Sequence, residues 1–251
     1  MSAPTPILRV AGLGVRYGEQ VALHDVSFAV DRGELIAVVG PNGAGKSTMF
    51  KAVCGLVNHS GVVEVNGVHC HDRTDRMDLA YIPQRHDNDL HFPITVGEMV
   101  LAGRRRFHRW WQRPRAADRE VAADSLEKVQ LGGSCDKALA ELSGGELQRA
   151  YVARALAQKA SVVLLDEALA GVDSPSTREL MGVFRQLAEG GTTLLVATHD
   201  LALARRSFDR CLAVNGTLRA DGRPTEVLSA SVLERVFGSA GAQEDGDALA
   251  D

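Results

Sequence analysis

The sequence predicts an α/β fold with three parts: a parallel-sheet core, an N-terminal antiparallel β subdomain and an inserted helical subdomain. Short β-rich runs broken by glycine predict the antiparallel part. Apolar strands that alternate with helices predict the core, and a helical pattern at about 88–157 predicts the insertion. These parts make one domain over 1–237, followed by an acidic tail, 238–251, that we expect to be disordered.

The first half of the chain supplies the antiparallel strands and the start of the core. We expect antiparallel strands at Ile7–Val10, Leu13–Tyr17 and Val26–Val30. Leu35–Val39 is apolar without alternation, which predicts a strand covered on both faces, and a helix should run from Gly45 to about Cys54. Two further short strands are expected at Val62–Val65 and Leu79–Ile82.

The second half contains the insertion and then returns to the core. We expect helices at 96–102, 117–129 and 143–157, with a break at 132–134. After them, helices near 176–189 and 201–206 alternate with strands expected at Val162–Leu165, Leu194–Ala197 and Cys211–Val214. This alternation is typical of a parallel sheet.

Charge, cysteines and apolar runs exclude several protein classes. The 251 residues carry a formal net charge of −4, but the tail holds four of the 32 acids and no basic residue, so 28 acids balance 28 bases over 1–237. A balanced body disfavours a nucleic-acid-binding protein coated in positive charge. Four cysteines without a C-x-x-C pair disfavour disulfide and zinc frameworks and fit a reducing compartment. We expect no signal peptide and no membrane span.

A glycine-rich segment matches the phosphate-binding pattern G-x-x-x-x-G-K-[ST], between a buried strand and a helix start. Its backbone N–H groups and the helix N-terminus can surround phosphate oxygens. Lys46 can reach the β and γ phosphates, and the Ser47 hydroxyl can ligate Mg²⁺. The alternative is a turn that binds nothing. The pattern predicts a P-loop NTPase core with phosphate contacts from Gly40, Pro41, Asn42, Gly43, Ala44, Gly45, Lys46, Ser47 and Thr48.

An apolar strand that ends in two acids supplies the second part of this site. Asp166 at the strand tip can hold the Mg²⁺ shell. Glu167 can orient and polarise a water molecule for attack on the γ-phosphate. Strands often end in solvated acids, so this pattern gains its meaning from the phosphate-binding loop.

Residues 142–149, Leu-Ser-Gly-Gly-Glu-Leu-Gln-Arg, closely resemble the signature motif of ATP-binding cassette (ABC) ATPases. A serine cap and two glycines also predict a second anion-binding helix N-terminus, with a plain helix cap as the alternative. The resemblance covers about 7 to 237 and implies a RecA-like core that binds and hydrolyses ATP with Mg²⁺. It also implies a homodimer, in which ATP held by one subunit faces the other subunit's Ser143, Gly144, Gly145 and Glu146.

Four other positions match the ABC pattern. Tyr17 resembles the aromatic residue that stacks on adenine, although a sheet-edge tyrosine would look the same. Gln84 resembles the Q-loop glutamine, which implies contacts to Mg²⁺ and the attacking water. His199 resembles the switch histidine at the γ-phosphate, although a lone histidine after a strand is usually structural. Asp173 closes a D-loop, which implies packing across the dimer; the preceding residues 168–169, Ala-Leu, depart from the usual proline and aromatic pair.

A single cassette without a membrane span implies separate integral membrane permease subunits and a location on the cytoplasmic side of the plasma membrane. Residues 81–85, 92–96 and 100–104 resemble the manganese, zinc and iron branch of bacterial ABC importers. That branch implies ATP-driven import of a transition metal or metal chelate, with an extracytoplasmic substrate-binding protein. An exporter, an importer of another cargo and a soluble ABC protein remain alternatives, and no nucleic acid partner is expected.

Two features stay outside this interpretation. His69, Cys70 and His71, with His86 and His91, suggest either a metal sensor or a solvated hairpin. Residues 104–115 hold six arginines and both tryptophans. This segment fits nucleic acid, the cytoplasmic leaflet beside a permease, or a solvated loop.

Overall fold

The computed structural model describes residues 5–69, 78–84, 93–109 and 112–237. Its antiparallel sheet has the strand order β2-β1-β4-β5, formed by β1 (Leu8–Tyr17), β2 (Gln20–Val30), β4 (Ser60–Val65) and β5 (Val68–His69). β1 is one strand where two were predicted, because its pairing slips at Gly12 without breaking. β2 begins six residues before the predicted Val26, and it passes through Asp25 at φ 49°.

The second sheet has six strands in the order β10-β9-β3-β8-β7-β6. All neighbours are parallel except the pair β10 and β9. The strands are β3 (Leu35–Val39), β6 (Leu79–Ile82), β7 (Val162–Asp166), β8 (Thr193–Ala197), β9 (Arg210–Val214) and β10 (Leu218–Gly222). The predicted parallel core is confirmed.

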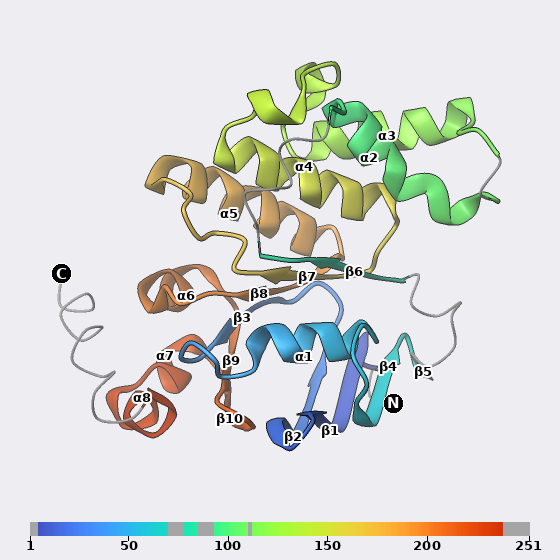
Figure 1. Ribbon diagram of the computed structural model, residues 1–251. Coiled ribbons are helices and arrows are strands. Elements are labelled where there is room, and N and C mark those ends of the chain that lie inside the picture. Colours follow the sequence, from blue (N-terminus) through green and yellow to red (C-terminus); the bar gives the residue numbers. More distant parts are fainter. Residues whose placement is uncertain (1–4, 70–77, 85–92, 110–111, 238–251) are drawn as a thin grey trace.

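Two cores lie on opposite faces of this sheet. Successive side chains of β3 alternate between them: Leu35 packs with the helical side, and Ile36 packs with the antiparallel sheet. Helix α1 (Lys46–Val53) lies between the two sheets (Figure 1) and buries Met49 and Phe50. β3 ends at Val39 and α1 begins at Lys46, so the short loop between them lies at the carboxyl edge of the sheet.

The helical insertion packs above the sheet (Figure 1). It contains α2 (Val96–Ala102), α3 (Ala116–Lys128) and α4 (Gly144–Ala157), together with three short 3₁₀ segments, η3 (Gly103–Phe107), η4 (Gly132–Ser134) and η5 (Leu139–Glu141). α2 begins with a capping box, in which the Thr95 hydroxyl accepts from the Glu98 N–H and the Glu98 carboxylate accepts from the Thr95 N–H. The three predicted helices are confirmed with ends shifted by about one residue.

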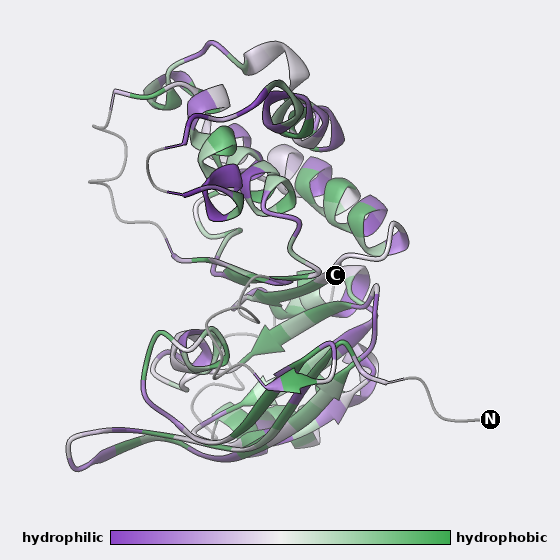
Figure 2. Ribbon diagram, turned by 90° about the vertical axis from the view of Figure 1, so that its right-hand side faces the viewer, coloured by the Kyte–Doolittle hydropathy of each residue, from purple (hydrophilic) through white to green (hydrophobic). Residues whose placement is uncertain are grey.

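The last part of the chain holds α5 (Ser174–Glu189), α6 (Leu201–Ser207), α7 (Pro224–Val227) and α8 (Ala230–Phe237). The sequence analysis missed β10, α7 and α8. β10 is an edge strand that pairs with β9 alone. Arg219 and Asp221 are exposed and the other three residues are only partly buried, so the strand has no apolar run that would predict it. The helices are short. Figure 2 shows the apolar strands inside and polar faces on the outer helices.

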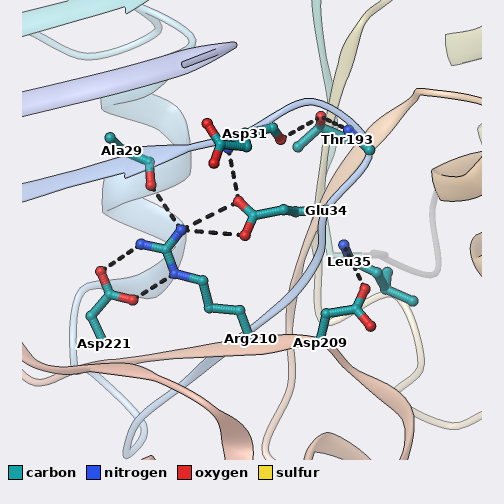
Figure 3. A network of polar contacts seen from close by, with 9 residues as sticks. Ala29, Asp31, Glu34, Leu35, Thr193, Asp209, Arg210 and Asp221 are labelled. Carbon is teal, nitrogen blue, oxygen red and sulfur yellow. Dashed lines mark hydrogen bonds and ion pairs between the residues drawn. The ribbon is translucent and has the colours of Figure 1, made fainter. Parts of the chain in front are cut away.

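A polar network joins the two sheets at the amino end of β3 (Figure 3). Arg210 donates to both carboxylate oxygens of Asp221 at 2.6 and 2.7 Å. It also donates to Glu34 at 3.3 Å and to the Ala29 carbonyl on β2 at 2.9 Å. Asp209 accepts from the Leu35 N–H at 3.3 Å. This network lies at the edge of the sheet opposite the phosphate-binding loop.

Candidate active site

The phosphate-binding loop turns between β3 and α1 through backbone that only glycine adopts easily. Gly45 has φ 95°, and a Cβ there would lie 2.6 Å from the Leu23 side chain. Gly40 approaches the Val214 carbonyl so closely that a Cβ would overlap it. Because Gly45 is also the N-cap of α1, no side chain covers the first N–H groups of the helix. The loop therefore presents donors to an anion.

Lys46 lies across this loop and is almost fully buried. Its Nζ donates to the Gly40 carbonyl at 2.7 Å and to the Pro41 carbonyl at 3.1 Å. Burial lowers the pKa of Lys46, while the nearby carboxylates of Glu167 and Asp166 oppose that shift. The cation is held by neutral carbonyl groups, which a phosphate can replace with a stronger, charge-assisted bond.

Asp166 receives a hydroxyl on each carboxylate oxygen. Ser47 Oγ donates to Oδ1 at 2.9 Å, and the Tyr81 hydroxyl donates to Oδ2 at 2.9 Å. Burial and the Asp166 charge raise the pKa of Tyr81, so it stays a donor. A carboxylate and a serine hydroxyl beside a phosphate-binding loop are the oxygen ligands that Mg²⁺ takes. These residues fit that ion.

Glu167 and Gln84 meet beside this pair. Gln84 Nε2 donates to Glu167 Oε2 at 2.6 Å. Glu167 has φ 48°, in the left-handed region, where the chain leaves β7. The ends of β6 and β7 thus bring together two of the predicted catalytic residues, which are 83 positions apart.

Most of the predicted nucleotide contacts line one cavity of about 460 Å³. Tyr17 lies at its wall with residues 42–48 and Glu167. The sequence analysis missed five other lining residues, Gln20, Val21, Ala22, Asn215 and Gly216. The Gly216 N–H donates to the Ala44 carbonyl at 2.9 Å and so supports the loop. The sequence does contain a signal for two of these residues, because Asn215 and Gly216 form an Asn-Gly turn directly after the predicted strand Cys211–Val214.

A second cavity, of about 610 Å³, adjoins the first at Glu167. His199 lines it two residues after the end of β8 and is exposed. The next residue, Asp200, caps α6 by accepting from the Leu203 N–H at 2.7 Å. Glu167 and His199 therefore border one space, and Glu167 faces both cavities.

The signature segment lies elsewhere in the same chain. Ser143 caps α4, and Glu146 Oε2 accepts from the Ser143 N–H at 2.9 Å and from its hydroxyl at 2.7 Å. These hydrogen bonds lower the pKa of Glu146. Gly145 allows close packing on α5, since a Cβ would lie 2.9 Å from that of Ser176. Within the described ranges, the lining of the 460 Å³ cavity includes none of residues 143–146.

Asp173 is likewise engaged within its own element. Its carboxylate caps α5, accepting from the Ser176 N–H at 3.0 Å and the Ser176 hydroxyl at 2.8 Å. These bonds lower the pKa of Asp173. Asp173 does not line either cavity in the part of the chain that the structure describes.

Not all arginines of the segment 104–115 lie on the surface. Arg104 is buried, donates to Asp118 at 3.0 Å and to the Ala157 carbonyl at 2.9 Å. His108 Nε2 lies 2.7 Å from the other oxygen of Asp118. The interpretation of 104–115 as a solvated or partner-binding patch is therefore wrong for Arg104, and Trp110 and Trp111 lie outside the described residues.

The histidine cluster cannot be assembled from the described residues. His69 contacts Glu64 at 3.4 Å, while Cys70, His71, His86 and His91 lie outside those ranges. Within them, no group of three or more His, Cys, Asp or Glu side chains is placed to hold a metal ion. Within them, too, every helix is too short or too polar to span a membrane.

Comparisons with known proteins agree with this geometry. Residues 23–170 match the ABC transporter family. The manganese transport system ATP-binding protein MntB of Halalkalibacterium halodurans is 35% identical over 232 residues, 92% of each chain. The zinc transport system ATP-binding protein TroB of Treponema pallidum is 36% identical over 239 residues, 95% of this chain and 89% of that protein.

A solved structure shows the same fold. It is cbiO1 from Clostridium perfringens, part of the ABC transporter complex cbiONQ, with 27% identity and a TM-score of 0.79 over 92% of this chain and 94% of that one. This likeness confirms the expected P-loop NTPase fold. The chain belongs to the ABC transporter family, as one of its ATP-binding subunits that hydrolyse ATP.

Proposed function

We propose that this ATPase drives the import of a transition-metal ion, Mn²⁺ or Zn²⁺, or of a metal chelate. The ATPase part rests on one observation, the meeting of the Ser47–Asp166 pair and the Gln84–Glu167 pair beside the phosphate-binding loop. The cargo part is supported by the names of the relatives, which cover about nine-tenths of this chain. We assign residues 1–237 to one nucleotide-binding domain.

The site residues divide the work as follows. The loop N–H groups and Lys46 bind the phosphates, and Tyr17 stacks on the adenine. Ser47, Asp166 and Gln84 would hold Mg²⁺, which would neutralise charge on the phosphates. Further contacts come from the rest of the loop, including Thr48.

Glu167 and His199 act on the γ-phosphate side. Because Gln84 donates to Oε2 of Glu167, that carboxylate is held with Oε1 available to accept a hydrogen bond from water. His199 borders the adjoining cavity and can donate to a γ-phosphate oxygen. The carboxylate thereby orients the water, and the imidazole orients the phosphate.

A second copy of the chain completes the site. The signature residues and Asp173 lie outside the cavity that holds the loop, Tyr17 and Glu167. At the start of α4, Gly144 is exposed and carries no side chain that would keep a phosphate away from the backbone, while Gly145 is buried against α5. We assign Ser143, Gly144, Gly145 and Glu146 to the ATP of the partner subunit, and Asp173 to the dimer contact.

The permease supplies the membrane path. A groove of about 350 Å³ separates the end of β6 from the helical insertion, and its lining includes Ile82, Pro83, Ile94, Met99 and Leu139. Its place beside Gln84 suits a docking site for the cytoplasmic face of integral membrane subunits. An extracytoplasmic substrate-binding protein then delivers the cargo, and the ATPase stays on the cytoplasmic side.

Metal uptake in a deletion strain tests the cargo. The strain receives the wild type, Glu167→Gln or the matched control Glu189→Gln, an exposed carboxylate at the end of α5. Uptake of radiolabelled Mn²⁺ and Zn²⁺ should return with the wild type and with Glu189→Gln only. Unchanged uptake of both ions after deletion would contradict metal import, and a rise in cellular metal would indicate export.

A further inference from the structure

Tyr81 lies on the face of the sheet that α1 covers. β6 and β7 are parallel, and Tyr81 pairs with Leu164 in their register. Side chains at alternate positions share a face, so Leu164 and Asp166 point to the side of Tyr81. Tyr81 and Leu164 pack in the core beneath α1, whereas Ile82 packs in the helical core. The register therefore carries the phenol toward the carboxyl end of β7.

The phenol completes the hydrogen bonding of Asp166. The two carboxylate oxygens accept one hydroxyl each, from Ser47 and from Tyr81, both at 2.9 Å. Asp166 is only 1% exposed, so water cannot readily replace either donor. The terminal torsion of an aspartate is broad, and a carboxylate held at one oxygen can still rotate about it. A second donor on a rigid ring removes that rotation.

We propose that Tyr81 is a positioning residue of the ATPase, whose hydroxyl fixes the Asp166 carboxylate so that Oδ1 stays directed at Ser47, the pair that would hold Mg²⁺. The proposal rests on the assignment of Asp166 and Ser47 to Mg²⁺ made above. Tyr81 itself is directed at the oxygen away from Ser47 and acts through Asp166. Outer partners of this kind change metal affinity about 10- to 100-fold when they are removed.

The same strand end also holds the neighbouring acid. Three residues after Tyr81, Gln84 donates to Glu167. Residues 81–84 thus set two consecutive carboxylates by separate hydrogen bonds. Loss of the Tyr81 hydroxyl should therefore loosen Asp166 while Gln84 still holds Glu167.

The test is Tyr81→Phe in the full-length chain, which keeps the ring and removes the hydroxyl. Nucleotide binding is measured by calorimetry with ADP across a Mg²⁺ series and in EDTA. We expect the Mg²⁺ concentration that gives half of the affinity gain to rise about 10-fold. The affinity in EDTA should stay within about 2-fold of the wild type, because the loop and Lys46 are unchanged.

Thr193→Val is the matched control for a lost buried hydroxyl. Thr193 lies at the opposite end of the sheet, accepts from the Gly33 N–H at 2.9 Å and donates to the Asp31 carbonyl at 3.2 Å (Figure 3). It should lower the thermal midpoint and leave the Mg²⁺ response unchanged. A Tyr81→Phe chain with a wild-type Mg²⁺ response, or with equal losses in Mg²⁺ and EDTA, would overturn the proposal.

Asp166→Asn separates this failure from failure of the metal site. If Asp166→Asn abolishes the Mg²⁺ response and Tyr81→Phe does not shift it, the metal site stands and the role of Tyr81 is wrong. If the wild type shows no Mg²⁺ response, or Asp166→Asn keeps it, the Mg²⁺ assignment itself is wrong. The expected pattern is loss in Asp166→Asn and a shifted midpoint in Tyr81→Phe.

Discussion

The two ends of the six-stranded sheet use charged side chains differently. At the amino end, Arg210 bonds to two carboxylates and a backbone carbonyl, which ties the sheets together (Figure 3). At the carboxyl end, buried Lys46 donates to two loop carbonyls, and the carboxylates of Asp166 and Glu167 lie nearby. The charges at the amino end therefore stabilise the fold, whereas those at the carboxyl end are placed to bind a ligand. Substitutions at the two ends should therefore affect different measurements.

The largest expected effect is at Glu167. Glu167→Gln keeps the shape of the side chain but removes the charge that polarises water, so ATP turnover should fall about 10²- to 10⁴-fold. Nucleotide affinity should stay near the wild-type value. Steady-state phosphate release and equilibrium ATP binding measure the two quantities. Turnover within 2-fold of the wild type would remove Glu167 from the assigned role.

Lys46→Ala should affect binding next most strongly. It removes a buried cation that would form charge-assisted bonds to phosphate, each worth about 1.5–3 kcal/mol, or roughly 10- to 100-fold in affinity. Calorimetry with ADP measures this loss. The free energy of unfolding without nucleotide should change little or rise, because burial already costs the Lys46 charge. A large loss of stability with unchanged ADP affinity would show that Lys46 stabilises the fold instead of binding phosphate, and would contradict the difference between the two ends of the sheet.

Arg210→Met should show the reverse pattern. It leaves Asp221 and Glu34 without their shared cation, and these groups are partly exposed. We expect a loss of about 1–3 kcal/mol in the free energy of unfolding and unchanged nucleotide affinity. Urea unfolding is the measurement, with Arg235→Met on the exposed face of α8 as the control. Weaker ADP binding by Arg210→Met would show that the two ends are coupled.

The smallest expected effect is the pH dependence of stability at the signature segment. In a single chain, the charged Glu146 of this segment bonds to its neighbour Ser143, as the charges at the amino end of the sheet bond to one another. The pKa of Glu146 is lowered by its bonds to Ser143, so its contribution is present above the unfolded value of about 4.3 and is lost as pH falls through the folded pKa. Glu146→Gln should cost about 0.3–1 kcal/mol at pH 7. Urea unfolding should show a smaller difference at pH 3 than at pH 7, and a constant difference would contradict it.

Local patterns were enough to predict one end of the sheet. The phosphate-binding loop is one short segment between a strand and a helix, and the two acids are another at the end of an apolar strand. Each segment could therefore be recognised from its own sequence. The carboxyl edge of a parallel sheet then gathers them with Gln84. This part of the site needed no knowledge of distant packing.

Contacts that depend on register or on distant pairs could not be predicted. The bond from Tyr81 to Asp166 requires the pairing of strands 85 residues apart. Arg104 stood in a run of arginines that looked exposed, yet Asp118 on α3 and a carbonyl on α4 bury it. Arg210 had no local motif at all, because its partners lie on three different strands or turns.

Sedimentation velocity of Glu167→Gln tests the central claim, that one chain carries half of each ATP site. With saturating ATP and Mg²⁺ the mass should double from monomer to dimer, and it should stay monomeric without nucleotide. Adding Ser143→Arg should prevent the dimer, because a large cation cannot fit where the partner's signature meets ATP, while ATP binding persists. A monomer that binds ATP and does not associate, or a dimer indifferent to Ser143→Arg, would contradict the account.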